Sequence, residues 1–173
     1  ALVDLEYYKS ICIVKRESTT IGTKIQQCTS DIFTGDAKKD FNLAYWINPD
    51  RGELFFAKKV ILVEGATEKT LIPPLARKIN CFKHDLTIVD CGSKDNIPLY
   101  VQLLNKFNIP YTAVYDLDHQ SHKKHDAIVS ADKSSSLIEQ SIDPIIGKTV
   151  VFGNDIEEEI GTIAGTSSKP YEA

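Results

Sequence analysis

Apolar residues form their clearest pattern after residue 58. Runs at 60–63, 86–89, 111–115 and 149–152 predict four strands, because β-branched, aliphatic and aromatic residues dominate them. The first run is continuous, which is typical of a strand that is buried on both faces of a parallel sheet. A sheet is therefore expected to form the centre of this part of the chain.

Between these runs the apolar spacing changes to that of helices. Residues 67–79 predict a helix that Pro73 and Pro74 bend or interrupt, because proline lacks the backbone N–H that a helix interior needs. Residues 96–107 predict an amphipathic helix. Its apolar face carries Leu99, Leu103, Leu104 and Phe107.

Each of the first two gaps between strands holds one predicted helix, which is the arrangement of βαβ units. It predicts an α/β fold with a parallel sheet and right-handed crossovers. Shorter helices are expected at 135–142 and 155–163. Ligands of such sheets collect beyond the carboxyl ends of the strands, so candidate chemistry is sought there.

The first 57 residues carry a weaker pattern. Residues 10–16 and 23–28 predict two strands that pair across a turn rich in Ser, Thr and Gly. Residues 36–46 are a candidate helix, and the turn cluster at 48–52 marks a boundary. The apolar pattern is too sparse for a separate core, so we expect a small N-terminal appendage of strands and a helix.

The composition of the chain excludes several classes of protein. The chain has 173 residues, a formal net charge of −4 and no Met. The charge excludes a protein that coats nucleic acid by bulk electrostatics, because such proteins are strongly basic. No apolar run reaches the roughly 20 residues of a membrane span, and no signal peptide opens the chain, so no membrane partner is expected. The lack of Met and the abrupt ends lead us to expect a piece of a larger protein.

The cysteines form no CxxC pair. We expect all four to be small buried hydrophobic residues of a reduced, cytoplasmic protein. Their spacing does not favour a zinc site. They are Cys12, Cys28, Cys81 and Cys91.

Acidic residues directly follow two of the predicted strands. Glu64 comes after the run at 60–63, and Asp116 and Asp118 come after the run at 111–115. Positions two apart in an extended segment point the same way, so both aspartates can reach one point that Glu64 faces from a neighbouring strand. Converging carboxylates repel each other, and a hard divalent cation such as Mg²⁺ or Mn²⁺ relieves that repulsion.

Blander interpretations exist for two acids near this edge. Glu68 lies in the first turn of the helix after Glu64, where it can join the cluster or only stabilise the helix N-terminus through the dipole. Asp118 can be a solvated turn residue. Gly92 and Ser93 form a turn after the second strand, before the next helix.

A polar stretch after the third strand contains His119, His122 and His125 beside Lys123 and Lys124. The three-residue spacing of the histidines suggests zinc, but no fourth soft ligand is near in the sequence. Two other interpretations are a loop that contacts a DNA backbone and a solvated, mobile loop.

A resemblance to a known family is carried by the string Val60-Ile61-Leu62-Val63-Glu64-Gly65-Ala66-Thr67-Glu68 together with Asp116-Leu117-Asp118. It resembles a Toprim domain, the metal-binding module that primases, topoisomerases and certain nucleases share. With the lead-in Leu54-Phe55-Phe56-Ala57-Lys58-Lys59, it is similar to the OLD (overcoming lysogenization defect) family. These ATP-dependent nucleases join an ABC-type ATPase to a C-terminal Toprim domain, and the nuclease subunit of the Gabija anti-phage system belongs to the wider group.

The resemblance covers residues 53–173 and implies a Rossmann-like central parallel sheet flanked by helices. It also implies roles for the acids. Glu64 corresponds to a glutamate that acts as metal ligand or general base, and Asp116 and Asp118 correspond to paired metal-binding aspartates. Glu68 corresponds to a second glutamate that helps to bind a second metal.

Two further roles fall late in the chain. The segment 154–158 resembles one that adds a metal ligand; among Asp155, Glu157 and Glu158, Glu157 is favoured. Lys169 resembles a late lysine that stabilises charge on the scissile phosphate. The alternatives are an acidic helix start for Glu157 and a plain surface lysine for Lys169.

The implied function is that of a metal-dependent DNA endonuclease, which nicks or cleaves phosphodiester bonds with two Mg²⁺ or Mn²⁺ ions. Residues 1–52 are then the tail of a preceding ATPase module, and residues 53–173 are the Toprim nuclease domain. ATP is expected only on a module outside this chain, because no Walker A sequence is present.

Other expectations follow from the same resemblance. A DNA partner, a homo-oligomer, a cytoplasmic location and a role in antiviral defence are all implied by the family. The alternatives are a primase- or topoisomerase-type Toprim domain and a non-catalytic Toprim scaffold that binds DNA or protein.

Overall fold

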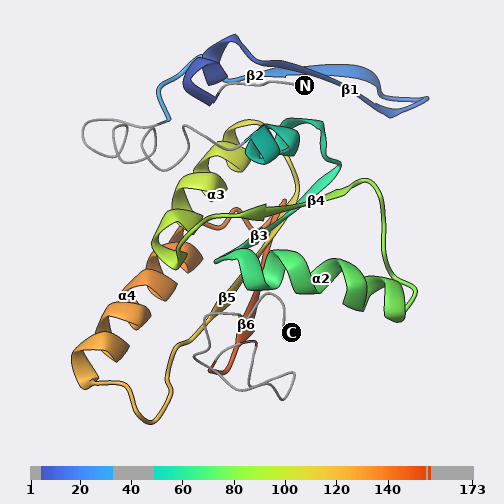
Figure 1. Ribbon diagram of the computed structural model, residues 1–173. Coiled ribbons are helices and arrows are strands. Elements are labelled where there is room, and N and C mark those ends of the chain that lie inside the picture. Colours follow the sequence, from blue (N-terminus) through green and yellow to red (C-terminus); the bar gives the residue numbers. More distant parts are fainter. Residues whose placement is uncertain (1–4, 33–48, 155, 157–173) are drawn as a thin grey trace.

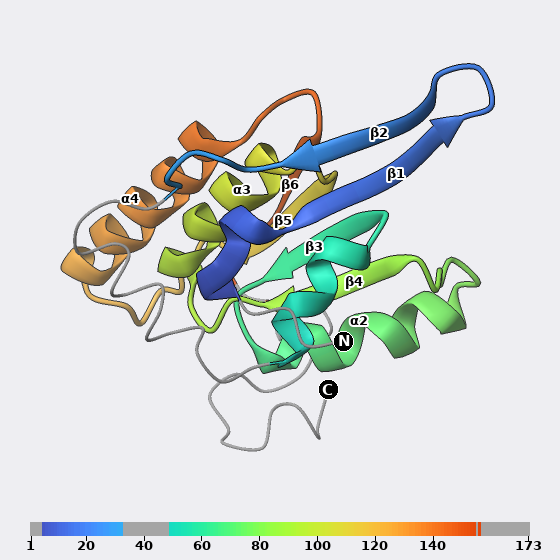
Figure 2. The ribbon, with the colours of Figure 1, turned by 90° about the horizontal axis from the view of Figure 1, so that it is seen from above.

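The computed structural model describes residues 5–32, 49–154 and 156. Its centre is a sheet with helices on both faces (Figure 1), and a two-stranded hairpin projects beside it (Figure 2). The candidate helix at 36–46, and all of that at 155–163 except residue 156, lie outside the described residues. No helix in the described part of the chain combines the length and the apolar character of a membrane span.

All four predicted strands are confirmed and form one parallel sheet. They are β3 (Lys59–Val63), β4 (Leu86–Asp90), β5 (Tyr111–Asp116) and β6 (Gly147–Phe152). Their order across the sheet is β4-β3-β5-β6. The chain therefore steps from β3 to one side, returns past β3 to β5, and continues to β6.

This reversal determines which helix covers which face. The helices are α2 (Ala66–Lys78), α3 (Ile97–Lys106) and α4 (His125–Ser141). With right-handed crossovers, a change of direction across the sheet moves the connecting helix to the other face. Accordingly, α2 lies on one face, and α3 and α4 lie together on the other (Figure 1). The predicted α/β fold is confirmed.

Two helices differ from their predictions. Pro73 and Pro74 do not interrupt α2, which runs through both and keeps Leu71 buried while it loses the two backbone hydrogen bonds that prolines cannot donate. α4 begins at His125 and not at Ser135. Its first turns carry the short apolar run Ala127-Ile128-Val129, but polar residues at 132–136 follow, so no clear amphipathic face marks this part of the helix. Ile138 is its one buried residue.

The core lies between β3, β5 and α3. Leu103, Leu104 and Phe107 of the predicted apolar face are fully buried, and Leu99 is partly buried. The Phe107 ring meets the Phe55 ring edge-on, with 5.1 Å between the centroids. These contacts anchor the short 3₁₀ helix η2 (Pro49–Phe56), which replaces the predicted turn at 48–52.

The other face of β3 is less well covered than its sequence predicts. Val60, Leu62 and Val63 are buried, but Ile61 is only half-buried, although β3 has a strand on each side. On the edge strand β4, Ile88 is also half-buried. α2 therefore leaves part of this face open.

The N-terminal hairpin confirms the predicted strand pair. After the 3₁₀ helix η1 (Leu5–Ser10), β1 (Cys12–Ser18) pairs antiparallel with β2 (Gly22–Gln27). The prediction that every cysteine is buried is wrong for two of them. Cys28 and Cys91 are buried, whereas Cys12 and Cys81 are exposed, because Cys12 alternates onto the outer face of the hairpin and Cys81 follows α2 in a loop.

Candidate functional site

The predicted acids lie where β3 and β5 end. Glu64 follows the last residue of β3, and Asp116 is the last residue of β5. These two strands are neighbours, and the strand order changes direction between them, with β4 on one side and β6 on the other. In open α/β sheets such a switch point is where ligands bind. Topology therefore places the acids at the edge where chemistry is expected.

A hydrogen bond joins the ends of these strands. The Asp116 backbone N–H donates to Glu64 Oε1 over 2.7 Å. Burial raises the pKa of Glu64 to about 7, although this hydrogen bond and the nearby ammonium of Lys94 act in the opposite direction. The negative charges of Asp118 and Glu68 raise the pKa further. The carboxylates of Asp118 and Glu68 are thus close enough to influence Glu64, whereas Asp116 acts on it through its backbone N–H.

Glu68 also has a structural role. Its Oε2 accepts a hydrogen bond from the backbone N–H of Gly65, over 3.1 Å, and the residue is only 8% exposed. A glutamate at this position of the first turn stabilises a helix start by satisfying the N–H that precedes it. The helix-end interpretation of Glu68 therefore has a contact that supports it, and its metal role stays a prediction.

Asp118 reaches the site by a route that the sequence did not predict. Its φ of +65° lies in the left-handed region. The chain is therefore not extended at Asp118, whereas the argument from alternating side chains assumed an extended segment. Its N–H donates to the carbonyl of Asn154 over 3.2 Å. Its carboxylate pairs with Lys123 at 2.6 Å and lies 3.9 Å from Lys94. Asp118 is therefore an ion-paired residue rather than a simple solvated turn.

Lys94 is the residue that sequence reasoning missed. It is 7% exposed, and its ammonium donates a hydrogen bond to the carbonyl of Asp116. The ammonium also lies 5.3 Å from the centroid of the Tyr115 ring, a favourable position for a cation. The available signal was its place directly after the Gly92-Ser93 turn, since the chain leaving β4 must pass the same edge of the sheet.

The turn before Lys94 is built from its own polar groups. Gly92 has a φ of +76°, and its N–H donates to Asp90 Oδ1 over 2.6 Å. Ser93 Oγ accepts the N–H of Asp95 over 3.2 Å and caps the short helix η3 (Lys94–Asn96). These bonds hold the backbone that directs Lys94 inward, so Gly92 and Ser93 contribute by positioning.

Two side-chain contacts hold part of the polar stretch after β5. His119 Nε2 lies 2.7 Å from Asp132 Oδ1 on α4, and Lys123 is paired with Asp118. His125 is already the first residue of α4. Lys123 therefore faces the acids, whereas a DNA-contacting role for this stretch stays a prediction.

The acids at this edge offer oxygen ligands of the kind that a hard cation binds. Carboxylate oxygens are the ligands that Mg²⁺ and Mn²⁺ prefer. The side chains do not form a finished shell: among the described residues, no three His, Cys, Asp or Glu groups are placed to hold an ion. Glu64 and Glu68 accept backbone N–H groups, and Asp118 is turned to lysines. Metal binding at this edge requires these contacts to open.

The structure does not describe the candidate site residues near the end of the chain. Asp155, Glu157, Glu158 and Lys169 lie outside the described residues. Asn154, which accepts the Asp118 N–H, shows that the chain passes the acidic edge just before them. Their roles stay predictions.

The raised pKa of Glu64 predicts a pH dependence of stability in chelator-containing buffer. Above pH 7 the folded protein holds an ionised, buried Glu64, and below pH 7 that carboxyl is protonated. The folded state favours the protonated carboxyl of Glu64, so this group contributes its full stabilisation of the fold below about pH 4.5. The contribution is lost as the pH rises through about 7. Urea denaturation should show wild type losing at most about 1.4 kcal/mol per pH unit relative to Glu64→Gln in this window. A constant difference between the two proteins would contradict the assignment.

The buried ammonium of Lys94 predicts a stability loss on its removal. Lys94→Met leaves the Asp116 carbonyl without this donor and the acids without the charge, so the free energy of unfolding should fall by about 1–3 kcal/mol. Lys106→Met, at an exposed position of α3, is the matched control and should change it by less than about 0.5 kcal/mol. Equal losses for the two variants would rule out a special role for Lys94.

Comparison with known proteins finds a matching family model and a related nuclease. Residues 55–118 match the family model described as Overcoming lysogenization defect protein-like, TOPRIM domain, and this segment includes Glu64, Glu68, Asp116 and Asp118. The chain is 26% identical over 149 residues to an OLD nuclease of Thermus scotoductus. That alignment covers 79% of this chain but only 28% of the relative's length.

Solved structures of C-terminal regions of OLD proteins are also similar. One from Xanthomonas campestris pv. campestris is 29% identical, covers 62% of this chain and 56% of that chain, and gives a TM-score of 0.43. One from Burkholderia pseudomallei is 19% identical, covers 66% of this chain and 70% of that chain, and gives a TM-score of 0.47. Residues 55–118 are therefore similar to a Toprim domain of the OLD-like family.

Proposed function

We propose that this chain is the catalytic domain of a metal-dependent endonuclease that nicks or cleaves DNA. The observation that carries the proposal is the group of acids at the β3–β5 switch point, with a buried lysine among them. The similarity to a protein named OLD nuclease supports the same reaction class. Phosphodiester hydrolysis needs a site that binds cations and tolerates the negative phosphate, and both features fit this edge.

In this proposal, Glu64, Asp116 and Asp118 are the central metal ligands, and Glu68 and Glu157 complete the sites. Two Mg²⁺ or Mn²⁺ ions, when bound, supply an activated water and stabilise the leaving oxygen. A pKa near 7 suits a general base, because the ionised carboxylate is then present near neutral pH and can hold the proton that it accepts from water. Glu64 is therefore proposed to orient the attacking water or to bind a metal.

The lysines are proposed to offset the negative charge of the acids and of the substrate phosphate. Lys94 is held by the Asp116 carbonyl and stays at the edge whichever way Asp118 turns. Lys123 lies on the stretch between β5 and α4, so its long side chain can exchange Asp118 for a phosphate oxygen. Lys169 is proposed to stabilise negative charge that develops on the scissile phosphate.

The wider assembly is part of the same proposal. Residues 1–52 connect residues 53–173 to a preceding ATPase module, which binds the ATP. The whole protein is a cytoplasmic homo-oligomer that acts in antiviral defence. The chain spans about a quarter of the length of the curated relative it matches, so these features belong to the longer protein.

Plasmid nicking tests the proposal. Full-length protein with Mg²⁺ or Mn²⁺ should convert supercoiled plasmid to nicked circles. Asp116→Ala should lower the rate by about 100-fold or more, because loss of even a residue that only supports a metal ligand costs about 10–100-fold. Asp126→Ala is the matched control, because Asp126 is an exposed acid in the first turn of α4. It should cleave at the wild-type rate.

Four outcomes would contradict the proposal. Nicking that survives Asp116→Ala would place the chemistry elsewhere. Relaxed closed circles instead of nicked ones would indicate a topoisomerase-type domain, and nucleotide incorporation would indicate a primase. Absence of any product together with absence of Mn²⁺ binding would indicate the non-catalytic scaffold.

A further inference from the structure

We propose that a groove between α2 and β4 binds a single strand of DNA and leads it toward the acidic edge. This inference rests on the proposed function, because it names the form of the substrate and the path by which it reaches the site. The argument uses the open face of β3 and β4, the charges at its rim and an aromatic cluster at its far end.

The groove is a cavity of about 560 Å³ between the helix and the sheet. Its floor is apolar and consists mainly of Ile61 on β3, Ile72 on α2 and Ile88 on β4, none of which is fully buried. Isoleucines on a sheet face normally pack against a helix, so a surface that α2 leaves half-covered is suited to a flat apolar ligand group. A nucleobase is such a group.

The groove begins beside the acidic edge. Lys69, which lines it, follows Glu68 in the first turns of α2, and Ile88 lies two residues before the end of β4. α2 then runs away from this edge to Arg77 in its last turn. With a rise of 1.5 Å per residue, Lys69 and Arg77 are about 12 Å apart along the helix. A strand in the groove would therefore span more than one nucleotide and point at the acids.

The rim of the groove is cationic. Lys69, Arg77 and Lys83 contribute positive charges, and Glu53 is the one carboxylate among the described residues that line it. Arg77 and Lys83 are exposed, so a ligand can reach them. Because the chain as a whole carries a charge of −4, a local excess of positive charge selects an anionic partner.

An aromatic cluster lies at the end of the groove farthest from the acids. The Arg77 guanidinium lies 4.4 Å from the centroid of the Phe82 ring. The rings of Phe82 and His84 meet edge-on, with 5.0 Å between their centroids. Proteins that bind single strands combine a positive groove with rings on which bases stack, and an arginine beside the ring strengthens this arrangement.

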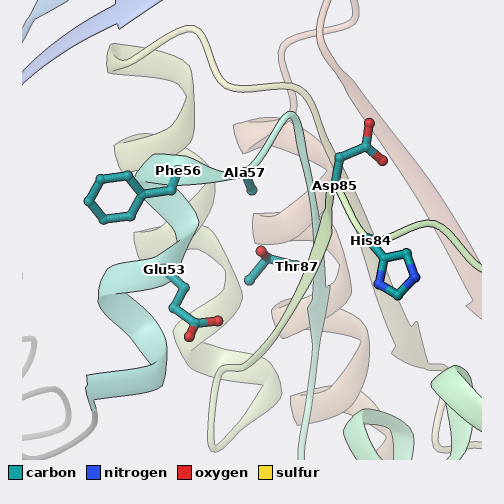
Figure 3. Close-up of a pocket in the computed structure, with 6 residues that line it drawn as sticks. All are labelled: Glu53, Phe56, Ala57, His84, Asp85 and Thr87. Carbon is teal, nitrogen blue, oxygen red and sulfur yellow. The ribbon is translucent and has the colours of Figure 1, made fainter. Parts of the chain in front are cut away.

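The groove continues into a second cavity of about 310 Å³ beside the amino end of β4, since Glu53, His84 and Thr87 line both. Figure 3 shows this cavity, with Glu53 and Phe56 contributed by η2, and Asp85 and Thr87 by β4 and the residue before it. The two cavities together form a path along β4. Cavities of this size hold a short flexible segment, so a single strand fits the path better than the broad surface of a duplex does.

The test measures how the full-length protein binds a labelled single-stranded oligonucleotide, by fluorescence anisotropy. Ca²⁺ replaces Mg²⁺ in the buffer so that binding is measured without cleavage. Arg77→Gln with Lys83→Gln should make the dependence of log Kd on log salt shallower by about 1.4, because each phosphate contact contributes about 0.7. Phe82→Leu should raise Kd about fivefold or more, because it keeps the apolar bulk but removes the ring. The matched control, Lys78→Gln with Lys106→Gln, removes two exposed charges that do not line the groove and should leave both values unchanged.

The outcomes separate this inference from the proposed function. If wild type binds and cleaves DNA but the groove variants keep its Kd and salt dependence, the groove inference is wrong and the nuclease proposal stands. If wild type binds no DNA at all, both are wrong. If the groove variants change only the oligomeric state in sedimentation, the groove is a protein interface, which also overturns the inference. Circular dichroism of each variant verifies that it is folded.

Discussion

Charge compensation at the carboxyl edge of the sheet is the constraint on which the rest of this structure depends. Glu64, Glu68, Asp116 and Asp118 lie near one another, and an uncompensated cluster of this kind is costly to bury. The structure meets the constraint with backbone N–H groups for the glutamates and with the ammonium of Lys94 at the centre. Burial still raises the pKa of Glu64 to about 7. A divalent cation bound beside the carboxylate would favour its ionised form.

The order of the strands explains both the acidic edge and the groove. Since the chain steps to β4 and then returns to β5, β3 and β5 meet with their loops diverging, which leaves room for polar groups at their ends. Among the α-helices of the described residues, the same reversal leaves α2 alone on its face of the sheet, while α3 and α4 share the other. One helix does not cover both β3 and β4, so Ile61 and Ile88 remain accessible. A site and a path toward it thus arise from one topological feature.

The sequence predicts the frame of this molecule well and the details of the site less well. The apolar runs locate every strand of the sheet, because burial selects β-branched and aromatic residues there. The first half of α4 carries no clear amphipathic pattern, and the two prolines of α2 suggest a break that does not occur.

Site details escape prediction for a different reason. The left-handed turn at Asp118 and the inward direction of Lys94 depend on contacts between segments far apart in the chain. The acids themselves could be named from their positions after buried strands. Their hydrogen bonds to backbone N–H groups, and their pairing with Lys94 and Lys123, could not.

Calorimetric titration with Mn²⁺ tests the central claim most directly, namely that the acids at the β3–β5 edge bind a divalent cation. Wild type should bind Mn²⁺, and Glu64→Ala should bind it at least about tenfold more weakly. Asp126→Ala, which alters an exposed acid in the first turn of α4, should match wild type. Equal affinity in all three proteins, or no binding by wild type, would contradict the account.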